Sequence, residues 1–180
     1  MKFLTNPSNP SAHELTTGPE IFNQLDGNVG AVVCGVGTGG TITGLGKFFE
    51  KNSPSTEMIL ADPKGSIVKN ALENNEFKDA DYSWLVEGIG EDFIPETLDL
   101  NYIKKAYEIS NEEAFNIIRD LALNEGILAG SSSGTLIAAA LKYCKEQEKN
   151  KNVVTFVCDN GEKYLNTAYN KLWLKEKNLI

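Results

Sequence analysis

The residues with the clearest capacity for chemistry form a glycine-rich stretch, Gly35–Gly44, in which Thr38 and Thr41 carry hydroxyl groups. A short apolar run over 29–34 predicts a buried strand before it, and apolar periodicity over 41–50 predicts a helix after it. A glycine turn from strand to helix leaves backbone N–H groups unpaired, with the positive end of the helix dipole behind them. Because glycines allow close approach and hydroxyls add donors, we expect this loop to bind a phosphate group.

The stretch is compatible with more than one ligand. Gly35, Gly37 and Gly40 spell the dinucleotide fingerprint G-x-G-x-x-G. Asp62 follows at about the 20-residue spacing of a ribose-binding acid. The rival interpretation is a loop for one terminal phosphate, and the third is a tight turn without a ligand. The loop residues by themselves leave these alternatives open.

Composition limits the other classes of function. The chain has 180 residues, of which 41% are hydrophobic, enough for one domain with a core. It has no apolar run of membrane-spanning length and no signal pattern, and its net charge of −8 argues against a nucleic-acid surface. Cys34, Cys144 and Cys158 lie in apolar segments, which predicts reduced, buried thiols in a cytoplasmic protein. The lone histidine, His13, excludes a multi-histidine metal site.

The remaining sequence predicts the scaffold that positions these residues. Ser110 and Glu113 match a capping box at the start of a helix that ends near Gly126. The expected elements, in order, are a packed turn over 1–11, a helix over 12–25, strands over 29–34 and 56–61 around the 41–50 helix, a strand over 105–109, helices over 111–124 and 135–149, a strand over 152–158 and a helix from 164. This alternation predicts an α/β fold with an open, mainly parallel, twisted sheet flanked by helices.

Three loops follow predicted strands or strand-like runs, at 37–41, 130–134 and 159–161, and we expect them to meet in one crevice. The serines Ser131–Ser133 either cap a helix or place a hydroxyl on the ligand. The long irregular region 73–100 is either functional or a surface excursion.

Six motifs in a fixed order carry a family resemblance. They are Asn6-Pro7-Ser8-Asn9-Pro10 with His13, Thr16–Ile21, Gly35–Thr41, Glu87–Gly90 with Phe93–Pro95, Gly130–Gly134, and Asp159–Tyr164. Over essentially its whole length, the chain resembles the cysteine synthase and cystathionine β-synthase family of pyridoxal-phosphate enzymes, which have the tryptophan-synthase-like fold (fold type II). The resemblance implies the large cofactor-binding domain of such an enzyme, with pyridoxal 5'-phosphate as cofactor. The family reaction replaces the β-substituent of serine or O-acetylserine by sulfide or a thiol.

The resemblance also implies roles for individual residues. The phosphate cradle would be Gly37, Thr38, Gly39, Gly40 and Thr41, the hydroxyl near the pyridine nitrogen would be Ser132, and the substrate-side loop that moves on closure would be Gly88, Ile89 and Gly90. A hydroxyl partner leaves the ring nitrogen largely unprotonated, and Asp62 becomes a strand-end residue and not a ribose ligand. Glu87–Gly90 and Asp62–Ser66 look nearer the cystathionine β-synthase branch, although the two branches share most of the other motifs.

The sequence departs from the family pattern in one respect. No counterpart is found for the Schiff-base lysine in its Pro-x-x-Ser-x-Lys-Asp-Arg context, nor for the Thr-Ser-Gly-Asn-Thr-Gly loop that holds the substrate carboxylate. We therefore expect residues 1–180 to form a single cofactor-binding domain without the family's N-terminal half, with no catalytic residue of its own and no β-replacement activity alone. A homodimer or a complementary N-terminal fragment would be its partner. The alternatives are a non-catalytic module that binds the cofactor or a protein, and a dinucleotide-binding domain.

Overall fold

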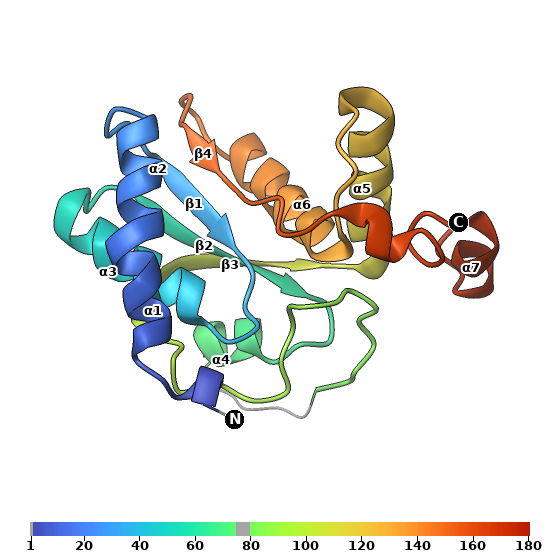
Figure 1. The fold of residues 1–180 in the computed structure, drawn as a ribbon, viewed down its shortest axis with the longest axis horizontal. Helices are drawn as coiled ribbons and strands as arrows, with labels where there is room; N and C mark the ends of the chain where they lie inside the picture. The colour runs from blue at the N-terminus through green and yellow to red at the C-terminus, as the bar shows by residue number, and fades with distance from the viewer. Residues whose placement is uncertain (1, 75–79) are drawn as a thin grey trace.

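The centre of the computed structural model, which describes residues 2–74 and 80–180, is a parallel β-sheet (Figure 1). Within those residues four strands pair in the order β3-β2-β1-β4. Their bounds are β1 (Ala31–Cys34), β2 (Glu57–Pro63), β3 (Ile103–Ile109) and β4 (Val153–Val154). Every pair is parallel, with Ala31 opposite both Glu57 and Val153. The predicted open, parallel α/β sheet is confirmed.

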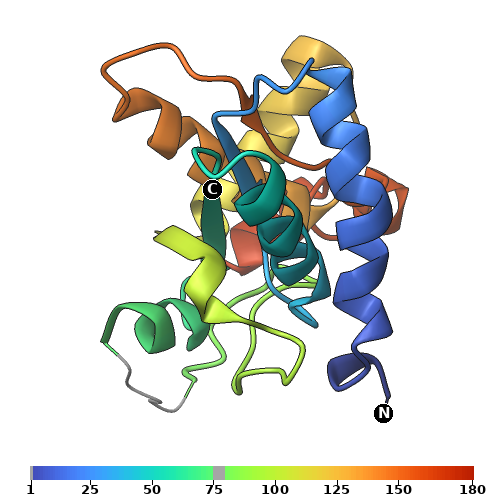
Figure 2. The same ribbon diagram turned by 90° about the vertical axis from the view of Figure 1, so that its left-hand side faces the viewer.

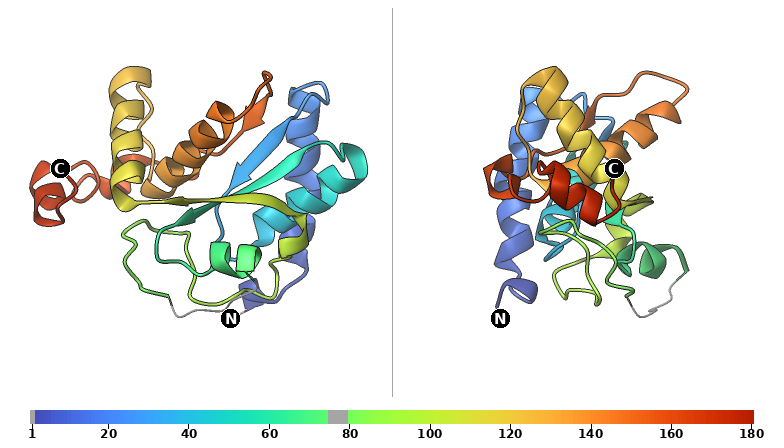
Figure 3. Two further views of the ribbon diagram at one scale, coloured as in Figure 1. Left: turned by 180° about the vertical axis from the view of Figure 1, so that it is seen from behind. Right: turned by 90° about the vertical axis from the view of Figure 1, so that its right-hand side faces the viewer.

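Alternating side chains of β1 enter two different cores. Val32 and Cys34 pack with the apolar side of α3 (Gly40–Asn52). Ala31 and Val33 pack with α6 (Ser131–Lys145), beside which lies α5 (Asn111–Glu125). A parallel strand covered on both faces needs apolar residues at every position, which explains the continuous apolar run that predicted it. Figures 1 and 3 show these helix layers on the two sides of the sheet.

The N-terminal segment is helical earlier than the sequence predicts. After η1 (Lys2–Leu4), a continuous helical rod consists of α1 (Ser8–Ala12), the π-helical turn η2 (His13–Thr17) and α2 (Gly18–Gln24) (Figure 2). The expected irregular turn over 1–11 is therefore wrong from residue 8 onward. Pro10 is tolerated because it occupies the first helical turn, where its missing N–H has no intrahelical acceptor.

The rod packs closely against α3. A Cβ on Gly44 would lie 2.1 Å from the backbone oxygen of Pro10, and a Cβ on Gly18 would lie 2.5 Å from the Phe48 ring. Two glycines thus allow the helices to approach, which brings His13 to the start of α3.

The segment after β2 corrects one boundary and confirms one expectation. The strand continues to Pro63, so Asp62 lies inside β2 and is 1% exposed. The helix α4 (Val68–Asn74) follows, and residues 75–79 of the predicted irregular region lie outside the described residues. Residues 80–99 contain no helix or strand and lead into η3 (Leu100–Tyr102).

The second half contains one accurate prediction and three shifted ones. Ser110 and Glu113 form the predicted capping box at α5, and Gly126 ends the helix at a φ of 70°. The next helix begins at Ser131 and not at 135. In place of a helix from 164, η4 (Gly161–Tyr164) is followed by α7 (Lys171–Glu176), which extends beyond the sheet (Figure 1).

The predicted strand over 152–158 shrinks to Val153–Val154. Beyond it, Thr155 reaches β1 with its side chain, since its Oγ1 donates to the Val33 carbonyl at 3.2 Å. An apolar run therefore indicated the position of this edge segment but not how much of its backbone pairs.

The cysteine prediction is correct for Cys34 alone. That thiol is buried, whereas Cys144 and Cys158 are exposed, and all three are free. No helix in the described ranges is both long and apolar enough to cross a membrane.

Candidate functional site

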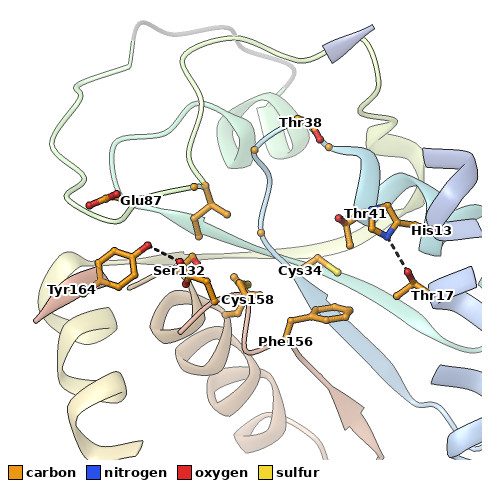
Figure 4. A pocket seen from close by; sticks show the side chains of 17 residues that line it. His13, Thr17, Cys34, Thr38, Thr41, Glu87, Ser132, Phe156, Cys158 and Tyr164 are labelled. Carbon is orange, nitrogen blue, oxygen red and sulfur yellow. Dashed lines mark hydrogen bonds between the residues drawn. The ribbon is translucent and has the colours of Figure 1, made fainter. Parts of the chain in front are cut away.

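A cavity of about 600 Å³ lies where the carboxyl ends of β1 and β4 face α3 and α6 (Figure 4). The three predicted loops meet here, since Gly37, Ser132 and Asp159 all contribute to its lining. On one side, Figure 4 shows His13, Thr17 and Thr41; on the other it shows Ser132, Tyr164 and Glu87, with Cys34, Phe156 and Cys158 between them.

The glycine loop forms the phosphate-sized part of this cavity. Gly39 has a φ of 81°, and a Cβ on Gly40 would lie 2.0 Å from Asn9 Oδ1, so neither position accommodates a side chain. The α3 helix begins at Gly40, and its first N–H groups lack intrahelical acceptors, as at every helix start. Thr38 Oγ1 accepts from Asn9 Nδ2 at 3.0 Å and from the Gly40 N–H at 3.3 Å, which leaves its own O–H able to donate.

His13 organises the second hydroxyl of the loop. Its Nε2 lies 3.3 Å from Thr41 Oγ1, and its Nδ1 lies 3.0 Å from Thr17 Oγ1. Partial burial lowers the pKa of His13, so the ring is neutral near pH 7. One ring nitrogen then donates and the other accepts, and this holds the Thr41 hydroxyl in place beside the loop.

The serines at the start of α6 answer the question that the sequence left open. The N-cap is Gly130, and no side chain caps this helix. Ser131 Oγ accepts from the Glu87 N–H at 3.1 Å, and Ser133 Oγ accepts from the Cys158 N–H at 2.9 Å. Ser132 lines the cavity while only 5% exposed. The outer two serines therefore join loops, and the middle one faces the site.

Asp159 and Tyr164 form an acidic pair on the same side. The Tyr164 hydroxyl donates to Asp159 Oδ2 at 2.9 Å. Burial, followed by the hydrogen bond to the carboxylate, raises the pKa of Tyr164 to about 12. Tyr164 is therefore a proton donor that stays neutral across the physiological range.

The predicted substrate-side loop lies directly on the glycine loop. Gly88 and Gly90 have φ values of 84° and 93°, which favour glycine at both positions. The Gly90 N–H donates to the Val36 carbonyl at 2.9 Å, and the buried Ile89 side chain abuts Gly35. Gly88 and Ile89 line the cavity, and Gly90 ties the two loops together.

Asp62 does not line this cavity. Its Oδ2 accepts from the Lys69 N–H at 2.8 Å, in the first turn of α4. Burial raises the pKa of Asp62 to about 6, and its Oδ1 has no hydrogen-bond partner among the described residues. A helix-start acceptor, not a ribose ligand, is the role that this geometry supports.

The sequence interpretation did not assign several of the lining residues to the site: His13, Thr17, Cys34, Glu87, Phe156, Cys158, Asp159 and Tyr164. The i, i+4 spacing of His13 and Thr17 was the one local signal, since it places both on one helix face. The others reach the cavity through pairing and packing between distant segments.

With this geometry established, comparison with known proteins assigns the class. The family model described as "Pyridoxal-phosphate dependent enzyme" matches residues 2–159. The chain therefore belongs to this family of pyridoxal-phosphate dependent enzymes.

Its curated relatives are more particular. Cysteine synthase A of Escherichia coli (strain K12) is 43% identical over 169 residues, which are 92% of this chain and 52% of that protein. Cysteine synthase A of Salmonella typhi is 44% identical over the same shares. Cysteine synthase of Staphylococcus aureus (strain N315) is 42% identical over 163 residues, covering 90% of this chain and 50% of that protein. The chain spans about half the length of the curated relatives it matches, and the family resemblance drawn from the motifs is confirmed.

Proposed function

We propose that this chain is the cofactor-binding part of a pyridoxal-phosphate enzyme of cysteine synthesis. The observation that carries the proposal is the glycine loop at the start of α3, open to a cavity of about 600 Å³ and lined by Thr38 and Thr41. The overall reaction would replace the β-substituent of serine or O-acetylserine by sulfide or a thiol. Family membership and the cysteine synthase relatives support this reaction class.

The residues present fit the cofactor at its phosphate end. Glycines occupy the positions where a Cβ would fill the cradle, and helix N–H groups and two hydroxyls supply donors for a dianion. Pyridoxal phosphate, when bound, supplies an electron-withdrawing ring that weakens bonds to the α-carbon of an amino acid.

The chain's own residues have the following proposed roles. Gly37, Gly39 and Gly40 approach the phosphate with backbone N–H groups, while Thr38 and Thr41 donate hydroxyl protons. Ser132 offers a neutral hydroxyl to the ring end, where it leaves a pyridine nitrogen largely unprotonated. Gly88, Ile89 and Gly90 border the substrate side, where the buried Ile89 helps to exclude water.

No lysine lines the cavity within the described part of the chain. We therefore infer reversible, non-covalent cofactor binding and no β-replacement by these 180 residues alone. The missing lysine would come from a complementary segment, and whether the chain forms a homodimer is a matter for the same measurement. Coexpression with a fragment that carries the lysine motif should restore absorbance typical of bound cofactor and cysteine formation. Cysteine formation by the purified chain alone would contradict this inference.

Titration with pyridoxal 5'-phosphate, followed by absorbance, tests the phosphate cradle. We expect inorganic phosphate to compete and Thr41→Val to weaken binding roughly fivefold, the loss of one hydrogen bond of about 1 kcal/mol. Thr16→Val is the matched control, because Thr16 is exposed, lies on the same helical rod as His13 and is not part of the cavity lining. Equal affinity for Thr41→Val and wild type, with no competition by phosphate, would refute the cradle.

A non-catalytic module is the second candidate, favoured by the absence of a lysine among the described lining residues. Such a module would bind the cofactor or a protein partner without chemistry. Failure of the lysine-bearing fragment to restore activity, while cofactor binding persists, would support it. A cytoplasmic location remains a prediction from the sequence. The dinucleotide alternative depends on Asp62, which is 1% exposed and bonded to the start of α4.

A further inference from the structure

A carboxylate lies against the glycine loop, on the side away from the cavity lining. Glu91 directly follows Gly88–Gly90, and its Oε1 lies 3.9 Å from the position that a Cβ on Gly37 would occupy. Glu91 is half-buried and is not among the residues that line the cavity. Its charge therefore reaches a ligand of the loop through the field and not through contact.

The backbone of Glu91 is firmly held. Its N–H donates to Ser66 Oγ at 3.1 Å, and its carbonyl accepts from the Ile67 N–H at 3.0 Å. The preceding Gly90 donates to Val36 in the glycine loop. These bonds come from the turn after β2 and from the loop itself, so the side chain has little freedom to leave Gly37.

The carboxylate lacks a compensating charge. Across residues 2–74 and 80–180, no hydrogen bond or ion pair to its oxygens is found. The titratable groups on the elements packed around it are Asp92 and Glu87 on its own segment, Asp62, Lys64 and Lys69 from β2 to α4, and His13 on η2. Burial, and then the charge of Asp92, raises the pKa of Glu91 to about 7. No other group in this set acts on it perceptibly.

We propose that Glu91 controls the affinity of the glycine loop for a dianion: ionised, it repels the phosphate of the ligand, and protonated, it does not. The inference rests on the proposed phosphate cradle and assigns it a built-in pH dependence. A carboxylate beside an anion site is unfavourable in its charged form, so anion binding and protonation of Glu91 strengthen each other. Binding is then stronger at pH 6.5 than at pH 8.5, about one pH step on each side of the transition.

Inorganic sulfate is the appropriate probe, because it stays dianionic across this range whereas phosphate titrates within it. Its affinity is measured by competition with pyridoxal phosphate between about pH 6.5 and 8.5, where His13 is already neutral because its pKa is lowered. For wild type we expect sulfate affinity to fall roughly tenfold over this range. Glu91→Gln should bind sulfate with the low-pH affinity throughout.

Asp92→Asn is the matched control. It removes an equal charge from the neighbouring exposed side chain, whose carboxylate accepts from the Tyr82 hydroxyl at 2.7 Å. This variant should retain most of the pH dependence. Sulfate affinity that is independent of pH in wild type, or equally dependent in Glu91→Gln, would overturn the role of Glu91 and leave the cradle intact. Absence of sulfate binding at every pH would overturn the cradle itself, and this inference with it.

Discussion

Replacing Gly44 by alanine should separate the N-terminal helical rod from α3 and thereby weaken the phosphate cradle. The added Cβ would lie 2.1 Å from the Pro10 backbone oxygen and 2.8 Å from the His13 Cβ. A carbonyl oxygen cannot rotate away as a long side chain can, so the helices must move apart. Asn9 and His13, which hold Thr38 and Thr41, lie on the displaced rod.

The size of this effect follows from two opposing terms. Alanine in a helix interior is favoured over glycine by about 1 kcal/mol. Overpacking costs about 1–3 kcal/mol, and a backbone contact this short places the cost at or above the upper end. We expect a net loss of about 2 kcal/mol in the free energy of unfolding.

Urea unfolding followed by circular dichroism measures the stability, and titration with pyridoxal phosphate measures the cradle. Affinity should fall roughly tenfold, because two supporting hydrogen bonds loosen together. Glu50→Ala, at an exposed position of the same helix, is the control and should change neither quantity by more than a small fraction. A Gly44→Ala variant more stable than wild type, with unchanged affinity, would show that helix propensity outweighs the contact and would refute the reasoning.

Two further predictions concern charged and polar groups away from the cradle. Tyr143→Phe removes a hydroxyl that donates to Glu57 Oε2 at 2.8 Å and accepts from Lys151 Nζ at 2.9 Å, joining α6 to both ends of the sheet. Urea unfolding should show a loss of about 1 kcal/mol, with a smaller loss for Tyr82→Phe in its exposed pair; equal losses would contradict the structural role. For Asp62, burial raises the pKa from 3.8 to about 6, so its folded form prefers the proton; the stability it contributes is full below about pH 4 and lost as the pH rises through 6. Asp62→Asn should therefore flatten the decline of stability between about pH 4 and 7, and an unchanged pH profile would exclude burial of the charge as its cause.

Local patterns in the sequence determined much of the scaffold. The apolar run of β1, the capping box at Ser110 and the glycine turn at Gly126 each depend on residues within a few positions of one another, and each occurs as predicted. The glycine loop belongs to the same class, because strand, turn and helix are adjacent in the chain. Local residues could therefore predict a phosphate-sized loop and a parallel α/β sheet, and the order of six motifs identified the family.

Tertiary structure decided what depends on distant segments. Pro10 begins a helix because that helix packs on α3, and β4 pairs over two residues only, beside an edge where Thr155 bonds through its side chain. Periodicity does not report which neighbour covers a residue, so the exposure of Cys158 was missed. The contacts of His13 with Thr41 and of Glu91 with Gly37 likewise join residues far apart in sequence. The sequence thus determined that a phosphate loop exists, and only the folded chain decided which hydroxyls, ring and carboxylate surround it.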